Sequence, residues 1–318
     1  MSERQRQRDL DTYRIVDSLP EAAYDDIVRL AARLCDAPVA TMSLIDRDRQ
    51  WFKSRIGIES TETSRDVAFC DHAVREPELL LEVPDATADP RFANNPDVTG
   101  GLGIRFYAGM PLVTPNGTAV GTVCVIDHKP RHLDASQREA LAALARITMN
   151  LLESRRQLLE AQRAVALQVP ANADAHEAPA PAASTPYSVA IVELQGYSSV
   201  VAQRGHRAVE QTLQQCSHAL ERLLEPGEAL NRVSGAPELV LTLNGEVTPE
   251  RLRAIERVGN TSAAMLGTDA IAVAATSASS SENPLEVFQR ADEELSLRKT
   301  QRVELRDTMA EPVMQARH

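Results

Sequence analysis

The segment of residues 170–186 constrains the fold of this 318-residue chain most, because its repeated prolines suit the interior of neither a helix nor a strand. It reads PANADAHEAPAPAASTP, with no periodic apolar residues, which is typical of a linker. It divides the chain into two parts of ordinary domain size. We therefore expect a first domain at 1–152, a helix end and linker at 153–186, a second domain at 187–310 and a tail at 311–318.

The charge and hydropathy of the chain exclude several classes of protein. A net charge of -11 disfavours nucleic acid and anionic membranes as partners, because both require clustered Lys and Arg. No run approaches the roughly 20 apolar residues of a membrane helix. The first residues, MSERQRQRDLD, lack the apolar core of a secretory signal. We expect a cytoplasmic protein.

The first part alternates between helical and strand patterns. Two strands joined by a polar turn, and two more joined by Pro115-Asn116-Gly117, predict antiparallel hairpins. The expected helices lie at 22–35 and 68–74, and the expected strands at 39–46, 50–56, 79–83, 104–113 and 119–127. The pattern predicts an antiparallel sheet flanked by helices.

A long helix follows, with Asp134 or Ser136 as its N-cap. Apolar residues then recur at intervals of seven, at Leu144, Leu151, Leu158 and Val165. This spacing suits a surface helix packed on its own domain or the seam of a two-stranded coiled coil. The helix is longer than one small domain needs, so we interpret its far part as the connector of a homodimer.

The second part predicts strands at 188–194 and 270–277 and a strand pair around 238–245 with its turn at Asn244-Gly245. Helices are expected at 207–224, at 249–258 and from Asn283, an N-cap followed by Pro284. This order suits helices packed against a mixed sheet. The whole chain is thus expected to be α+β, with two domains that each have a central sheet flanked by helices.

Five motifs of the first part resemble the GAF domains that precede GGDEF domains in bacterial sensors. They occur in family order between residues 10 and 152, and they read RQWFKSRIG, VAFCDHAV, VPDATADPRFANNPDVTG, GIRFYAGMPLVTPNG and GTVCVID. The resemblance implies a sheet of five or six strands with a small-molecule pocket on one face. The residues expected at that pocket are Trp51, Phe69, Cys70, His72, Asp85, Arg105, Tyr107 and Cys124.

Each pocket residue also has a structural interpretation. Phe69, Cys70 and Cys124 suit a core, while Asp85 and Arg105 suit an ion pair. Cys70 and His72 lack further metal ligands nearby, so we expect no metal and no cofactor. A redox role for Cys70 and Cys124 requires their Cα atoms to lie within about 7 Å. Motifs that attach a tetrapyrrole are missing from the sequence.

The second part resembles a GGDEF domain between residues 187 and 303. The matching segments are IVELQGY, RGHRAVEQTLQQCSHAL, RVSGAPELVL and RADEELSLRK. Glu193 and Gln195 stand at the two metal-binding positions of the first strand, and Val201 and Glu210 at the guanine contacts. The family's signature turn is replaced by Ser234, Gly235, Ala236 and Pro237, and a register shift would bring Glu238 to the acidic position.

These replacements predict a loss of cyclase chemistry. Nucleotidyl transfer requires carboxylates that hold two divalent cations, and a neutral Ala236 holds none. Every 1.4 kcal/mol of lost transition-state stabilisation costs about tenfold in rate, so several losses leave no useful activity. At the position of the family's inhibitory site, Glu225 and Glu228 would repel a cyclic dinucleotide.

The leading hypothesis is a signalling protein of the cyclic di-GMP system. Its GAF domain binds a small ligand or reports redox state, and its inactive GGDEF-like domain contacts a protein partner, for which a protein with a GGDEF or EAL domain is the candidate. The alternatives are a weak or altered nucleotide cyclase that uses Glu193 and Glu238, and a dimeric scaffold with an empty pocket.

Overall fold

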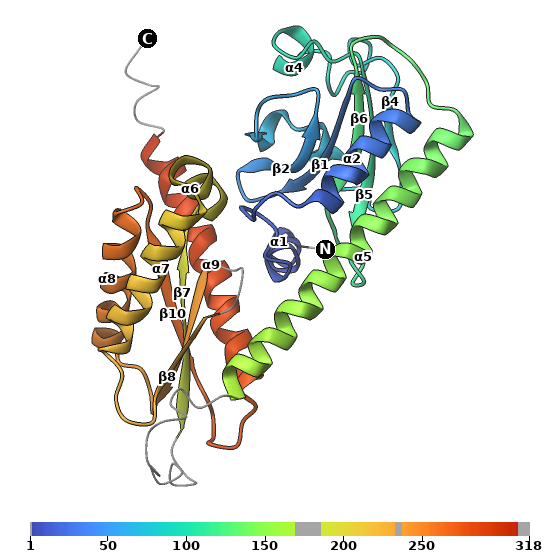
Figure 1. Ribbon diagram of the computed structural model, residues 1–318. Helices are drawn as coiled ribbons and strands as arrows, with labels where there is room; N and C mark the ends of the chain where they lie inside the picture. Colours follow the sequence, from blue (N-terminus) through green and yellow to red (C-terminus); the bar gives the residue numbers. More distant parts are fainter. Residues whose placement is uncertain (1, 169–185, 233–236, 311–318) are drawn as a thin grey trace. The chain divides into compact units, whose positions relative to one another are not determined.

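The computed structural model describes residues 2–168, 186–232 and 237–310. The chain forms two compact units, of residues 1–156 and 157–318, and the division falls inside the long helix α5, Ala135–Gln168 (Figure 1). The expected tail at 311–318 and most of the expected linker lie outside the described residues. Within the described part, no helix is both long enough and apolar enough to cross a bilayer.

The first unit is built on a six-stranded sheet with the order β3-β2-β1-β6-β5-β4, in which every neighbouring pair is antiparallel. This confirms the expected antiparallel sheet. The strands are β1 Val39–Ile45, β2 Arg49–Ile56, β3 Glu62–Ser64, β4 Leu81–Val83, β5 Phe106–Val113 and β6 Ala119–Asp127. The helices are α1 Glu3–Thr12, α2 Ala22–Leu34, a 3-10 turn at Arg65–Val67, α3 Phe69–Ala73, α4 Pro96–Thr99 and α5.

The sheet of the first unit has a core on each face. Neighbouring residues of a strand point to opposite faces, and β5 shows this at Phe106 and Tyr107. Phe106 packs into the core that α2 and α5 cover, together with Ile27 and Leu141. Tyr107 packs into the core beside α3, together with Phe69. The two faces therefore carry different chemistry.

Helix α5 begins with a capping box at Asp134. The Asp134 carboxylate accepts from the Gln137 backbone N at 2.8 Å, and the Gln137 side chain accepts from the Asp134 backbone N at 3.1 Å. The residues at intervals of seven then divide into two groups. Leu144 is buried in the first core and Leu151 packs against it, whereas Leu158 and Val165 are 60% and 61% exposed. The near half of the helix is thus a domain helix, and the far half presents Leu158 and Val165 to solvent.

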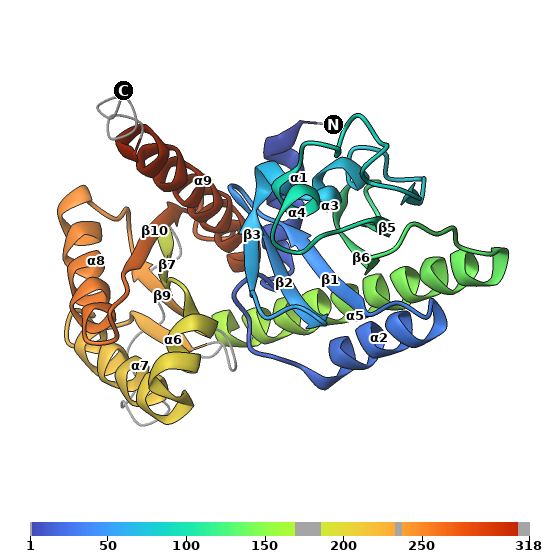
Figure 2. The same ribbon diagram turned by 90° about the horizontal axis from the view of Figure 1, so that it is seen from above.

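The second unit has a four-stranded sheet with the order β10-β7-β9-β8. Helices α7 and α8 pack together on one face, and α9 lies on the other (Figures 1 and 2). The strands are β7 Tyr187–Leu194, β8 Ala229–Arg232, β9 Glu238–Asn244 and β10 Ala270–Thr276. The helices are α6 Tyr197–Arg204, α7 His206–Glu221, α8 Pro249–Ala264 and α9 Pro284–Ala310.

Two expectations for the second unit were wrong. The sheet is not mixed, because all of its described pairs are antiparallel. The hairpin turn does not lie at Asn244-Gly245, because both partners of β9, the strands β8 and β7, precede it in the chain. Gly245, with a φ of +66°, instead leads from β9 toward α8, whose N-cap Thr248 accepts a hydrogen bond from the Arg251 backbone N.

The last turns of α5 belong to the second unit. Leu159 is 6% exposed and packs in a core with Val189, Val240 and Phe288. Arg163 lies one helical turn further along the same face and is also buried. The end of the connecting helix is therefore part of the hydrophobic structure of the second unit.

Candidate functional site

Four of the expected pocket residues gather beside α3. The Phe69 ring lies 5.2 Å from the Tyr107 ring and stacks on Phe92 with its centroid at 4.0 Å. The Cys70 and Cys124 sulfurs are 3.9 Å apart. All of these side chains are at most 4% exposed, and they fill the space between α3 and the sheet with one another.

Gly109 is what allows the Tyr107 hydroxyl to reach this cluster. Residues 107 and 109 share one face of β5, and a Cβ on Gly109 would lie only 2.1 Å from the Tyr107 hydroxyl oxygen. A side chain at position 109 would therefore displace the hydroxyl group. In the space that glycine leaves, Tyr107 donates a hydrogen bond to the Cys70 sulfur at 3.3 Å.

The Cys70 sulfur is surrounded by hydrogen-bond donors. Besides Tyr107, the Thr122 hydroxyl donates to it at 3.1 Å. Complete burial by itself would raise the Cys70 pKa, but hydrogen bonds from Cys124, Thr122, Tyr107 and Ser43 together lower that pKa to about 7. In the same cluster the pKa of Cys124 is raised well above its usual value, by its hydrogen bond with Cys70 and by burial.

The other expected pocket residues lie elsewhere. Trp51 packs in the core on the opposite face of the sheet, and the structure does not bring it together with Tyr107. The Asp85 carboxylate accepts from the Thr87 backbone N at 2.9 Å and from its hydroxyl at 2.6 Å. Arg105 donates to the carbonyl oxygens of Val98 and Ile104. Asp85 and Arg105 thus hold loops in shape.

His72 borders a surface recess of about 970 Å³ beside α3. Arg6, Arg65 and Arg75 also line it, and so do the acids Glu3, Asp66 and Asp71. Asp71 bonds Arg65 at 2.7 Å and also pairs with Arg75, so the charges of this recess are largely matched. A volume of this size is enough for a small polar ligand.

The two carboxylates of the candidate cyclase site lie directly opposite each other. Glu193 at the end of β7 is the register partner of Glu238 at the start of β9. The Lys299 ammonium group, from α9, lies 2.5 Å from the Glu193 carboxylate, and the Gln195 amide donates to that carboxylate at 3.1 Å. Glu193 is 5% exposed, so its charge is compensated inside the protein.

Arg163 of α5 compensates the second carboxylate. Its Nε and Nη2 atoms donate to the two Glu238 oxygens at 2.9 Å and 3.1 Å, a bidentate arrangement. The guanidinium group also lies 4.6 Å from the centre of the Phe288 ring. Arg163 and Glu238 are 5% and 1% exposed, so water does not screen this pair.

The two expected guanine contacts lie on α6 and α7. Val201 lies half-buried on α6, and the Glu210 carboxylate is bonded by Arg232 at 2.7 Å. Ser234, Gly235 and Ala236 lie outside the described residues. Glu228, at the expected inhibitory site, is turned inward, where it accepts from the Asn244 backbone N at 2.9 Å and pairs with Arg251.

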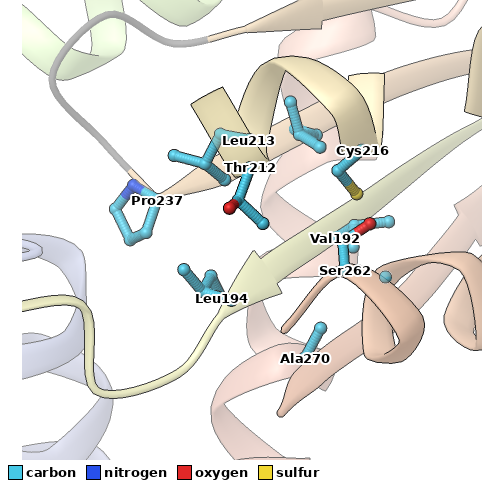
Figure 3. A pocket seen from close by; sticks show the side chains of 10 residues that line it. Val192, Leu194, Thr212, Leu213, Cys216, Pro237, Ser262 and Ala270 are labelled. Atoms are coloured by element: carbon cyan, nitrogen blue, oxygen red, sulfur yellow. The ribbon is translucent and has the colours of Figure 1, made fainter. Parts of the chain in front are cut away.

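A small apolar cavity lies between the sheet and the helices α7 and α8, and Pro237 stands at one side of it (Figure 3). Its volume is about 10 Å³, room for about one water molecule. Gly259 closes it on the α8 side, where a Cβ would lie 2.9 Å from Val192. This space could not take a nucleotide base.

The sequence did not single out the two basic residues, Arg163 and Lys299. Arg163 lies 75 residues from its partner Glu238, on a helix that was interpreted as a connector. Lys299 ends the motif RADEELSLRK, which was used only to recognise the last helix. The sequence gives one sign that a basic partner was needed. It is Glu238, an acidic residue that begins an apolar strand pattern.

Comparisons with known proteins find a family model for the first part and relatives in cyclic di-GMP metabolism. Residues 19–152 match the family model of the GAF domain. A cyclic di-GMP phosphodiesterase of Pseudomonas aeruginosa is 36% identical over 156 residues, which are 48% of this chain and 26% of that protein. The diguanylate cyclase DgcP of Escherichia coli is 24% identical over 206 residues, which are 59% of each chain. The chain thus spans less than two thirds of both relatives.

One solved structure similar to this chain is the GGDEF domain of DgcB from Caulobacter crescentus in complex with cyclic di-GMP. It is 17% identical, covers 36% of this chain and 74% of that chain, and has a TM-score of 0.32.

Proposed function

We propose that this chain, in which a GAF domain precedes a GGDEF-like unit related to enzymes of cyclic di-GMP metabolism, is a cytoplasmic regulatory protein without cyclase activity. The GAF domain receives the signal, as a small ligand in the recess beside α3 or as the redox state of its buried thiols. The second unit passes the signal on through contact with another protein.

The observation that carries this proposal is the state of the two opposed carboxylates. Glu193 is bound by Lys299, and Glu238 is bound by Arg163. Magnesium requires carboxylate oxygens that are free to coordinate, and the partly buried Lys299 ammonium and the buried Arg163 guanidinium already neutralise these. The signature turn also offers Ala236 where the catalytic chemistry needs an acid. In this proposal the second unit keeps its fold, and positive charges of basic side chains take the place of the positive charges of metal ions.

The packing of α5 supports one route for the signal. One helix contributes Leu144 to the GAF core and Leu159 to the core of the second unit. Helices are stiff over such lengths, so a change at the GAF end acts on the residues that hold β7 and β9. We propose that Arg163 is the point at which the second unit receives this change.

The relatives make a partner in the same signalling system the natural choice, such as a protein with an active GGDEF or EAL domain. A pull-down with the full chain as bait is expected to recover such a protein. Bait with Glu238→Leu and Arg163→Met together keeps this region packed and serves to test whether the charged pair takes part. Recovery of no nucleotide-signalling protein by either bait contradicts this part of the proposal.

The decisive experiment is turnover of GTP by the purified chain with Mg²⁺ or Mn²⁺, beside an active diguanylate cyclase as positive control. We expect no cyclic di-GMP and no other nucleotide product. The alternative, a weak or altered cyclase, draws support from the register pairing of Glu193 with Glu238. A product that forms with the wild type and disappears in Glu193→Gln would establish that alternative.

A further inference from the structure

We infer that Cys70 and Cys124 form a dithiol that hydrogen peroxide oxidises to a disulfide inside the GAF domain. The inference deepens the proposed function, because it rests on the GAF domain as the receiver of the signal and names one chemical form of that signal.

The two thiols lie close enough to form a bond after a small movement. Their sulfurs are 3.9 Å apart, and a disulfide bond requires about 2.05 Å. Cys70 is the second residue of the five-residue helix α3, and Cys124 lies within the central strand β6. A movement of roughly 2 Å, shared between side-chain rotation and a shift of α3, closes the bond.

The surroundings of the pair favour a reactive sulfur at Cys70. Thr122 and Tyr107 donate hydrogen bonds to it, and the Thr41 hydroxyl lies 3.0 Å from the Cys124 sulfur. Donors that point at a sulfur stabilise its thiolate, which is the nucleophilic form. This arrangement goes beyond what a structural thiol in an apolar core needs.

The other two cysteines of the chain provide the contrast. Burial raises the pKa of Cys35 to about 11, and its sulfur lies 4.0 Å from the carbonyl oxygen of Gln137. Burial also raises the pKa of Cys216, although a hydrogen bond with Ser262 opposes the shift. Neither is paired with a second thiol among the described contacts. Cys35 and Cys216 therefore serve as internal controls within the same chain.

The reaction balances with hydrogen peroxide as the oxidant. The Cys70 thiol releases its proton, the thiolate attacks one peroxide oxygen, an S–O bond forms and the O–O bond breaks. The hydroxide that leaves takes up the released proton, so a sulfenic acid and one water result. The Cys124 thiol then attacks the Cys70 sulfur, the S–S bond forms, and the S–O bond breaks to release a second water. In total, two thiols and one peroxide give one disulfide and two waters. Because both residues are at most 2% exposed, the oxidant must be about as small as water.

Closure of the bond would act on the recess beside α3. Asp71 follows Cys70 directly and bonds Arg65 and Arg75, which line the recess. A shift of α3 toward the sheet would move this carboxylate with it. Oxidation in the core would thereby change the surface at which the proposed polar ligand binds.

The test treats the full chain with hydrogen peroxide, blocks free thiols with iodoacetamide in denaturant and analyses a non-reduced digest by mass spectrometry. We expect a peptide that links Cys70 to Cys124, at a rate exceeding the oxidation of Cys35 and Cys216 by about tenfold or more. Dithiothreitol should reverse the link. Free Cys70 and Cys124 after Cys35 has been oxidised would overturn the inference.

Two variants identify the order of events. In Cys124→Ser the second thiol is missing, so dimedone should trap a sulfenic acid at Cys70. Cys216→Ser is the matched control and should form the disulfide as the wild type does. If neither the linked peptide nor GTP turnover is observed, this inference alone is contradicted. If both are observed, only the proposed loss of cyclase activity is contradicted.

Discussion

Arg163 and Glu238 form a buried bidentate ion pair across 75 residues of sequence, with nitrogen–oxygen distances of 2.9 Å and 3.1 Å. The pair joins the end of the connecting helix α5 to the first residue of β9, which directly follows the signature turn. A residue of the connector thus holds the strand on which a cyclase site would be built. Under the proposed function, this pair both occupies the Glu238 carboxylate and joins β9 to the connecting helix.

The first prediction concerns the energy of this pair. Arg163→Met leaves the Glu238 carboxylate buried without its partner, and we expect the second unit to lose about 3–5 kcal/mol of stability. Urea unfolding followed by far-UV circular dichroism measures this loss. Trp51, the only tryptophan of the chain, lies in the GAF domain, so its fluorescence midpoint should stay unchanged.

Two controls separate the buried pair from ion pairs in general. The double variant Arg163→Met with Glu238→Leu removes both charges and should recover most of the stability. Arg290→Met breaks an ion pair with Glu282 in which the arginine is 44% exposed, and should cost about 1 kcal/mol or less. Equal losses for Arg163→Met and Arg290→Met would show that the buried pair has no special role.

The second prediction concerns the dimer. Leu158 and Val165 are exposed at the heptad spacing, so a two-stranded coiled coil would bury them against a second copy. We expect Leu158→Arg to convert a dimer into a monomer in light scattering. Leu305→Arg, at a residue that is 63% exposed on α9, is the matched control and should remain dimeric. A dimer in both variants contradicts the coiled coil.

The sequence predicted those parts of the fold whose signal is periodic. Alternating apolar residues located β1, β2, β5 and β6, and the cap at Asp134 located the start of α5. Helix α1 was missed because it is held by polar contacts rather than by an apolar face. Arg6 donates to the Ile45 carbonyl oxygen at 2.6 Å, and Asp9 accepts from Thr118 at 2.6 Å. Hydrophobic patterns cannot reveal a helix of this kind.

The turn signal at Asn244-Gly245 was misread for a different reason. This dipeptide favours a hairpin because both residues tolerate a positive φ, but a helix entry also uses that freedom. For the site, the sequence named Cys70 and Cys124 but could not measure their separation, and it could not pair Arg163 with Glu238. Long-range contacts of this kind depend on the packing of whole elements.

The third prediction concerns pH. Partial burial would raise the Glu3 pKa, but hydrogen bonds and charges from Arg6 and Arg65 lower it from 4.5 to about 2. A carboxylate with a lowered pKa stabilises the fold above pH 4.5, and this contribution is lost as pH falls toward 2. Because Glu3 is partly exposed, we expect Glu3→Gln to cost about 1 kcal/mol or less at pH 7.

Thermal unfolding followed by Trp51 fluorescence measures this effect. The difference between wild type and Glu3→Gln should shrink as the pH is lowered through 4.5. The control is Glu59→Gln, at an exposed residue. If the stability difference between wild type and Glu59→Gln varies with pH in the same way, the role of Arg6 and Arg65 is contradicted.

The last prediction concerns the hydroxyl group of Tyr107. Tyr107→Phe keeps the ring against Phe69 but removes one donor from the Cys70 sulfur, so the Cys70 pKa should rise above about 7. In the wild type, the rate of Cys70 modification should increase with pH and reach half its maximum near pH 7, because only the thiolate reacts. The other titratable groups in contact, Tyr107 and Cys124, have raised pKa values and remain protonated there.

Mass spectrometry of Cys70 at a series of pH values tests this prediction, with the cysteine alkylated or oxidised under native conditions. The Tyr107→Phe profile should shift to higher pH and be several-fold slower at pH 7. Tyr24→Phe is the matched control, because Tyr24 is equally buried but packs on the opposite face of the sheet. Identical profiles for wild type and Tyr107→Phe would mean that the hydrogen bonds around Cys70 do not activate it, and the sulfur would then be an ordinary core thiol.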